Sequence, residues 1–436
     1  MREMKDSGVE WIGEIPKNWK VERLRYIIKD YKSGPFGSAL KMDGLLPDGN
    51  ILIYSPEHIT LHSSDSDKNL YLPDEREEEM SQFIVKENDI LFPIVGSLGK
   101  AMIITADMPK GIINQRVAKF QIDNTIVDQD YFMWLFAKSN FYQPYIDLSC
   151  RGSFIVNLTK AIINDIPCVI QPLAIQKKIS TYLDVKCSKI DEVIEKQQAI
   201  IEKLKEYKLS VIIETVTKGL NPNVEMKDSG VEWIGQMPTS WDCTTVGRIA
   251  TVVRGASPRP AGDPLYFNGN DVPWITVAEV TKGDGKYIDG TETFLTFEGA
   301  KQSRIVEEGT LLLSNSGATL GVPKITRIRG CINDGSVAFY NLSINQEFLL
   351  YLFKGRTFEL RKQMQGYGQP NLNTTIVKGI EVTLPTELEQ KLIVDFLDQK
   401  CTAIEKTIED REKAIDKLQE YKKSLIYEVV TGKKEV

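Results

Sequence analysis

One long segment occurs twice in this chain, and that duplication limits the folds available to it. Residues 173–217 and 387–431 align without a gap at a constant offset of 214 residues. Each copy places apolar residues at spacings of 7, 14 and 7, with a second apolar lane beside the first. Such a pattern makes a stripe along one side of a helix. Because it is sustained for about six heptads, it predicts a coiled-coil helix of about 65 Å in each copy.

The two stripes have an obvious way to be buried, which is to pack against each other. A whole domain lies between the segments and can bring the second one back, so we expect an intramolecular antiparallel pair. Gln197 and Arg411 interrupt the stripes near mid-helix. Such residues either fix the register at some cost in stability or form a solvated break in an imperfect stripe. The predicted pairing seam is Leu183, Ile190, Gln197, Leu204, Val211, Leu397, Ile404, Arg411, Leu418 and Leu425.

A second repeat shows that the whole chain is a tandem duplication. Residues 4–13 recur letter for letter as residues 226–235, and Pro16 and Trp19 match Pro238 and Trp241. Each unit therefore consists of a lead-in, a domain and a long helix. We predict four segments: residues 1–169 (lead-in and first domain), 170–220 (first helix), 221–384 (repeated lead-in and second domain) and 385–436 (second helix and tail). The predicted fold class is α+β: two β-rich domains separated by two long antiparallel coiled-coil helices, with a pseudo-two-fold internal repeat.

The two domains between these repeated frames are similar in type and different in detail. Both contain short β-type runs separated by Gly, Pro, Asn and Asp. Asn114 followed by 117–118 resembles Asn333 followed by 337–338, but most of the two domains diverges. Near-identical frames that hold different inserts are what two different binding modules on one scaffold would look like.

Composition narrows the class of protein further. The chain has 436 residues, with 42% hydrophobic and 26% charged, and no apolar run of membrane-spanning length or signal peptide. Six scattered cysteines without a CxxC pair indicate a cytoplasmic protein rather than a disulfide or zinc framework. The net charge of −6 argues against nucleic-acid binding. Acidic residues cluster at 74–79, however, and a DNA binder within an assembly can rely on positive charge from its partners.

The sequence offers no convincing catalytic centre. Residues 96–100 resemble part of a phosphate loop, but Ile94 stands where the motif needs glycine. His58 and His62 are the only histidines and have no cysteine near them in sequence. No methyltransferase or nuclease motif is present, so the chain is predicted to bind and position rather than to catalyse.

Gly-rich and polar loops supply the candidate DNA contacts. Arg, Gln and Asn can make bidentate contacts to base edges, while Ser and backbone N–H groups suit phosphates. For each residue an ordinary turn role is at least as plausible. The candidates are Ser33, Gly34, Phe36, Gly37, Ser38, Lys41, Gln115, Arg116, Arg151, Ser153, Arg254, Ser257, Arg259, Asn315, Arg327, Arg329, Tyr367, Gln369, Asn371 and Asn373.

With frame, inserts and helices considered together, the chain resembles the specificity subunits of type I restriction-modification systems over its full length. The resemblance rests on residues 7–19 and their repeat, on 34–41, on 369–373, on 389–391 and on the helix ends before 216–217 and 430–433. It implies that each domain is a target-recognition domain that reads half of a bipartite, asymmetric DNA site. It also implies that the helices set the spacing and dock two modification subunits.

The same resemblance places the chemistry on other subunits. This chain would be a non-catalytic recognition subunit without a cofactor or metal of its own. S-adenosylmethionine, ATP and Mg²⁺ would belong to the modification and restriction subunits, and double-stranded DNA would be the shared ligand. Two alternatives share many of these features: a specificity chain whose partner is a fused nuclease-methyltransferase, and a tandem DNA-binding protein without enzyme partners. A structural coiled-coil adaptor would explain the helices but not the two β-rich inserts.

Overall fold

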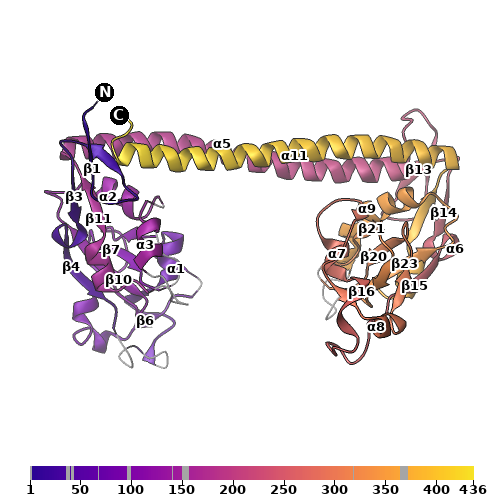
Figure 1. Ribbon diagram of the computed structural model, residues 1–436, viewed down its shortest axis with the longest axis horizontal. Coiled ribbons are helices and arrows are strands. Elements are labelled where there is room, and N and C mark those ends of the chain that lie inside the picture. Colours follow the sequence, from indigo (N-terminus) through magenta and orange to yellow (C-terminus); the bar gives the residue numbers. More distant parts are fainter. Residues whose placement is uncertain are drawn as a thin grey trace. The chain divides into compact units, whose positions relative to one another are not determined.

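The protein folds into two compact units that are each built from distant parts of the chain. The computed structural model describes residues 2–35, 40, 44–66, 68–95, 100–139, 141–149, 157–317, 319–363 and 372–436. Unit 1 comprises Met1–Lys196 with Lys413–Val436, and unit 2 comprises Gln197–Glu412. Helix α5 (Leu173–Lys218) and helix α11 (Glu387–Val430) each give one half to each unit. Both ends of the chain therefore lie in unit 1 (Figure 1).

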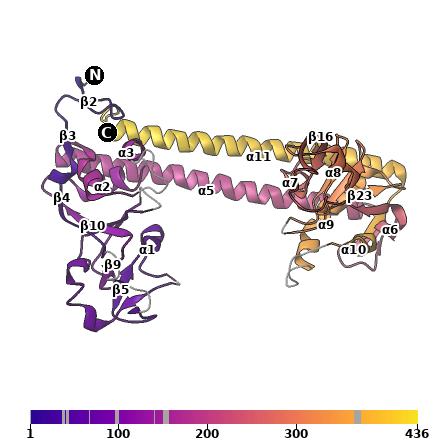
Figure 2. The same ribbon diagram turned by 60° about the horizontal axis from the view of Figure 1, so that its bottom comes forward.

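The halves of α5 and α11 pack side by side within each unit (Figure 2). In unit 1, Lys422 Nζ lies 2.6 Å from Asp191 Oδ1. In unit 2, Lys208 Nζ lies 3.0 Å from Glu405 Oε1, and the Arg411 guanidinium donates to Gln197 Oε1. In unit 2, residue numbers rise along one helix as they fall along the other, so the helices are antiparallel. The predicted α+β fold, with two β-rich domains and two long helices packed together, is confirmed.

The predicted seam residues are buried to different degrees. Those nearest the helix ends also belong to the domain cores, because Leu183 and Leu425 pack in the cluster that contains Trp19, and Leu397 packs with Trp241. Nearer mid-helix most of the seam residues are less buried. Ile404 is buried there, and the partly buried members are Ile190, Gln197, Leu204, Arg411 and Leu418. Val211, near the end of α5, is also only partly buried.

Each lead-in is a small hairpin that packs on the end of the other repeat's helix. The hairpins are β1 (Met4–Asp6) with β2 (Glu14–Pro16), and β12 (Met226–Asp228) with β13 (Gln236–Pro238). Gly432 follows α11 at φ +75°, and a Cβ there would lie 2.5 Å from Pro16 Cγ. Gly219 follows α5 at φ +76°, and a Cβ there would lie 3.0 Å from the Trp241 ring. Glycine both permits this left-handed turn and leaves room for the lead-in.

In the described parts of the chain, the main sheets of the two domains share four strands, and unit 2 adds a fifth. Each shared set is antiparallel, and the added strand β17 pairs in parallel with β21. In unit 1 the order is β4 (Ile28–Ser33), β10 (Val117–Ile122), β7 (Ile90–Pro93) and β8 (Met102–Ile103). In unit 2 it is β15 (Thr251–Arg254), β23 (Ser336–Tyr340), β20 (Leu311–Ser314), β21 (Pro323–Thr326) and β17 (Tyr287–Ile288).

Smaller sheets and short helices complete each domain. Unit 1 has β6 (Tyr71–Leu72), β5 (Ile51–Tyr54) and β9 (Gly111–Ile113) in one sheet, and β3 (Lys20–Arg23) with β11 (Pro167–Ile170). Its helices are α1 (Pro56–Leu61), α2 (Gln129–Phe136), α3 (Gln143–Ser149) and α4 (Lys160–Asp165), with 3₁₀ turns at Leu24–Tyr26, Asp74–Arg76 and Ser81–Phe83. Unit 2 has β18 (Phe294–Leu295), β16 (Phe267–Ile275), β22 (Gly330–Ile332) and β19 (Arg304–Val306), and β14 (Asp242–Thr245) with β24 (Glu381–Leu384). Its helices are α6 (Val246–Ile249), α7 (Val277–Thr281), α8 (Phe297–Lys301), α9 (Gln346–Gln363) and α10 (Thr374–Gly379).

The internal repeat extends to individual buried hydrogen bonds. Gln176, fully buried near the start of α5, accepts a 2.7 Å hydrogen bond from the backbone N–H of Asp128 at the start of α2. Gln390, at the same place in α11, accepts a 2.7 Å bond from the backbone N–H of Asn345 at the start of α9. Since a buried amide must be paired to be tolerated, these contacts fix each domain to its own long helix in the same way.

We predict that the polar pair in the seam costs stability. Replacing Gln197 and Arg411 together by leucine should raise the free energy of unfolding by about 1–4 kcal/mol, because apolar contact replaces a partly desolvated charge. Guanidinium denaturation measures the change. Arg411→Leu alone leaves the Gln197 amide without its donor and should gain less. A double variant that is less stable than the wild type would contradict this account of the seam.

Candidate nucleic-acid interface

The two domains present the same end of the main sheet with the same backbone arrangement. In unit 1, β4 ends at Ser33, and the N–H of Gly34 donates to the carbonyl of Val117 at 2.9 Å. In unit 2, β15 ends at Arg254, and the N–H of Gly255 donates to the carbonyl of Ser336 at 2.9 Å. Gly34 and Gly255, the first residues after these strands, therefore occupy equivalent places in the two domains.

A close backbone approach holds each of these loops. A Cβ added to Gly34 would lie 1.8 Å from the Asn114 carbonyl oxygen, and one added to Gly255 would lie 2.1 Å from that of Asn333. Only glycine allows this contact, because any side chain would overlap a main-chain atom. The backbone carbonyls of Asn114 and Asn333, the two asparagines aligned in the sequence, thus lie directly against Gly34 and Gly255.

Asp334 organises the loop in unit 2. Its carbonyl oxygen accepts a 2.8 Å hydrogen bond from Arg254 Nε, and its Oδ1 accepts a 2.5 Å bond from Ser257 Oγ. Arg259 NH2 lies 3.8 Å from Oδ2 of the same carboxylate. Both arginines remain exposed at this end of the sheet. Sequence reasoning did not single out Asp334, because only the fold brings it to residues about 80 positions earlier.

Asn315 lies at the same end of the sheet and is fully buried. Its backbone N–H donates to Gly335 at 2.9 Å and its carbonyl accepts from Leu372 at 2.7 Å. Neither atom of its side-chain amide has a hydrogen-bond partner in the described structure. Ile94 has the equivalent backbone contacts in unit 1, so the same position is apolar there. A buried side-chain amide without hydrogen-bond partners costs about 1–3 kcal/mol of folding stability. Contact with a ligand or with water would remove that cost.

In unit 1 the loop between β9 and β10, which matches residues 333–335 of unit 2, carries two polar candidates. Gln115 Nε2 donates to the Leu40 carbonyl at 3.1 Å, and the backbone N–H of Arg116 donates to Asn114 Oδ1 at 2.9 Å. The Arg116 side chain is exposed. Together with Lys68, these loop residues line a hollow of about 470 Å³. These two hydrogen bonds therefore fix the loop, while the Arg116 side chain is exposed to solvent.

Three of the candidates lie elsewhere or have a structural contact. Arg327 and Arg329 follow β21 at the opposite end of the sheet, where they pair with Asp289 at 3.1 Å and Glu307 at 3.0 Å. Asn373 caps α10 by accepting a 2.9 Å bond from the N–H of Ile376. The remaining candidates lie outside the described residues: Phe36, Gly37, Ser38, Lys41, Arg151, Ser153, Tyr367, Gln369 and Asn371.

The described part of the chain contains no cluster of three or more His, Cys, Asp or Glu side chains suited to a metal ion. Among the same residues, no helix combines the length and the apolar character that crossing a membrane requires. The geometry offers exposed arginines, hydroxyls and backbone groups on rigid sheet ends. Such groups can contact phosphates and base edges, and they form no arrangement of nucleophile and base.

Comparison with known proteins agrees with this interpretation. A family model described as the type I restriction modification DNA specificity domain matches residues 37–206 and 238–412. The chain is 25% identical to the type I restriction enzyme MjaVIII specificity subunit of Methanocaldococcus jannaschii, over 96% of this chain and 93% of that protein. It is 31% identical over 172 residues to the MjaIX specificity subunit of the same organism, which covers 38% of each chain.

Two solved structures share the fold at low sequence identity. A chain from a study of complex assembly and conformational transition in a type I restriction-modification system gives a TM-score of 0.73 at 16% identity, covering 95% of this chain and 98% of that one. The HsdS subunit from Thermoanaerobacter tengcongensis gives a TM-score of 0.51 at 16% identity, covering 96% and 98%.

We predict that Gly255→Ala destabilises unit 2 by about 1–3 kcal/mol, because the new Cβ would overlap the Asn333 carbonyl oxygen. Gly290→Ala is the matched control, since a Cβ there meets nothing within 4 Å. Denaturation curves of the two variants should separate clearly. Equal stability would mean that the loop can move away from Asn333 at no cost.

Proposed function

The chain belongs to the type I restriction modification DNA specificity family, and from this membership we propose that each β-rich domain reads one half of a bipartite, asymmetric DNA site. The proposal depends on one observation. The two domains have the same backbone arrangement at this end of the main sheet, but different side chains project from it. Gln115 and Arg116 stand in one domain where Asp334 and Gly335 stand in the other. One backbone frame with two sets of polar groups suits two readers that approach DNA alike and recognise different bases.

The chemistry of these loops supports contact with both the backbone and the bases of DNA. Exposed arginines such as Arg116 and Arg254 can pair bidentately with guanine, and asparagine or glutamine amides with adenine. Ser257 and nearby backbone N–H groups suit phosphate oxygens, which position a protein without reading sequence. The hydrogen bond from Arg254 Nε to the Asp334 carbonyl orients Arg254 before binding, which reduces the entropy lost when DNA is bound.

The two long helices are proposed to set the distance between the half-sites and to dock two modification subunits. Helices of 46 and 44 residues are about 65–70 Å long. Successive major-groove segments on one face of DNA are about 34 Å apart, so half-sites a turn or more apart are within reach of such a spacer. The bases between them would be spanned without being read.

The reactions of the complex are assigned to partner subunits. We propose that modification subunits supply S-adenosylmethionine and that restriction subunits use ATP and Mg²⁺, while this chain selects the site in the cytoplasm. Its negative net charge of −6 fits a subunit whose DNA affinity depends partly on basic partners.

Exchanging residues 20–169 for the matching domain of a relative should change one half of the methylated sequence and leave the other half intact. Single-molecule methylation sequencing, in cells that also express the cognate modification subunit, reads both halves and the gap. A change in both halves, or in neither, would refute the modular proposal.

Arg254→Ala should weaken methylation and DNA binding at one half-site by about 10–100-fold, which corresponds to the loss of one bidentate or phosphate contact. Arg329→Ala is the matched comparison, because it removes another exposed arginine from the opposite end of the same domain. Binding of the assembled complex to duplexes with each half-site altered in turn measures the effect. A larger loss for Arg329→Ala would place the reading surface at that other end.

A further inference from the structure

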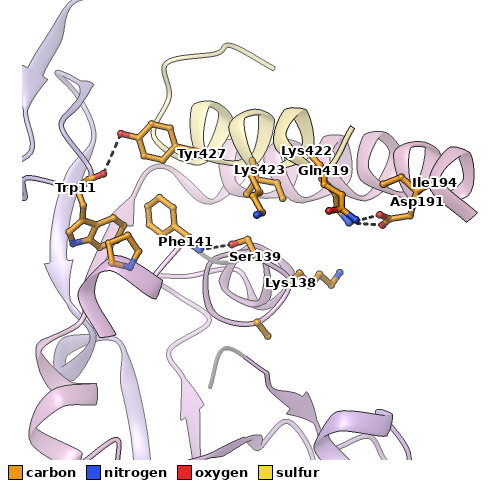
Figure 3. A pocket seen from close by; sticks show the side chains of 13 residues that line it. Trp11, Lys138, Ser139, Phe141, Asp191, Ile194, Gln419, Lys422, Lys423 and Tyr427 are labelled. Carbon is orange, nitrogen blue, oxygen red and sulfur yellow. Dashed lines mark hydrogen bonds and ion pairs between the residues drawn. The ribbon is translucent and has the colours of Figure 1, made fainter. Parts of the chain in front are cut away.

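Unit 1 contains an open groove that the proposed DNA contacts do not use. It has a volume of about 490 Å³ and lies between the α5–α11 pair, the residues that follow α2, and the first lead-in (Figure 3). Its apolar lining includes Trp11, Phe141, Ile194, Ile426 and Tyr427. The Trp11 and Phe141 rings meet edge to face at 4.8 Å, and Tyr427 OH donates to the Ile12 carbonyl at 2.9 Å. The groove therefore has a rigid aromatic wall.

The charged residues of this groove are mostly cationic. Three lysines and one carboxylate line it, namely Lys138, Lys422, Lys423 and Asp191. Lys422 Nζ bonds both oxygens of Asp191, at 2.6 and 2.7 Å. Lys138 Nζ lies 2.9 Å from Asp184, just outside the lining. Lys423 is exposed and makes no ion pair with the described residues.

The equivalent hollow in unit 2 has more carboxylates in its lining than the groove of unit 1. By the 214-residue offset, Lys422, Asp191 and Asp184 correspond to Lys208, Glu405 and Asp398. The hollow there is smaller, about 270 Å³, and its lining contains three lysines and three carboxylates. The charged groups therefore balance in unit 2, whereas positive charge is left over in unit 1.

A loop of the chain itself gives Lys208 a second carboxylate in unit 2. Lys208 Nζ lies 3.0 Å from Asp284 in this loop, in addition to its helix partner Glu405. Lys286 Nζ, two residues later, lies 2.7 Å from Asp398. The hydrogen bond from Lys208 lowers the pKa of Asp284, against the burial that raises it, so the carboxylate stays charged. Lys422 has only Asp191 among the described carboxylates, whereas Lys208 has two.

The loop belongs to the one main-sheet strand that has no counterpart in the described part of unit 1. It leads directly into β17, and the described main sheet of unit 1 ends at β8, the counterpart of β21. In unit 1, therefore, no described loop from a fifth strand covers the groove. The helix surface is duplicated, but among the residues that the structure describes its cover is present only in unit 2.

We propose that a segment of one modification subunit fills the groove of unit 1, with a carboxylate on Lys422 and Lys423 and an apolar side chain against Trp11, Phe141 and Tyr427. Asp284 in unit 2 shows the chemistry that such a segment supplies. This rests on the proposed function, in which two modification subunits dock on this chain. It follows that the two subunits bind unequally, because unit 2 already provides its own substitute.

Binding of purified modification subunit to the full-length chain tests the proposal, with the two binding steps resolved by calorimetry or native mass spectrometry. Lys423→Glu should weaken one step by about tenfold or more and leave the other unchanged, because it reverses a charge that faces the docked carboxylate. Lys189→Glu, an exposed lysine of α5 outside the groove, is the control and should change neither step. Raising the salt concentration should reduce the difference.

Trp11→Ala provides a second variant that removes apolar contact rather than charge, and it should weaken the same step. A thermal melt of each variant checks that it is folded. If both steps weaken equally in Lys423→Glu, or neither does, the groove is not the docking site and the inference is wrong. If the wild-type chain binds no modification subunit at all, the proposed function itself fails.

Discussion

The antiparallel packing of α5 on α11 is the interaction on which the rest of the structure depends. Leu183 and Leu425 join the core of unit 1, and Leu397 joins the core of unit 2, so the helix seam and the domain cores are one continuous apolar interior in each unit. Each such side chain contributes about 1.5–3 kcal/mol through burial. Without the second helix, each domain would lose one wall of its core.

This dependence runs in both directions between the two repeats. The first lead-in packs on the end of the second helix at Gly432, and the second lead-in packs on the end of the first helix at Gly219. The buried amides Gln176 and Gln390, by contrast, fasten each domain to the helix of its own repeat. Each unit is thus completed by parts of both repeats, which explains why the frame is repeated so closely while the inserts differ.

The sequence predicted what depends on periodicity, and missed what depends on close approach. The helix pair follows from apolar spacings of seven, and the repeat follows from identical segments. The β-rich inserts follow from short β-type runs between turn residues, and all three patterns can be read directly from the sequence. The role of Asp334 is not visible, because its contacts with Arg254 and Ser257 join residues about 80 positions apart. The sequence also grouped Arg329 with Arg254, although the fold places them at opposite ends of one sheet. Asn315 is buried at the position that Ile94 occupies in the other domain, and this equivalence could be found only by aligning the two folded domains.

The inserts differ in a second respect, which bears on how freely they can be exchanged. The Asp284 loop and β17 belong to the insert of unit 2, yet the loop contacts the repeated helices through Lys208 and Asp398. An insert therefore carries two separable properties: the polar groups at one end of its sheet, and the presence or absence of a loop that covers the helix pair. Two inserts that read different bases but share the loop would present the same helix surface to partners. An insert without the loop would leave Lys208 with Glu405 alone and would uncover this part of the helix pair, as in unit 1, so exchanging an insert would also change the helix surface that is open to a partner.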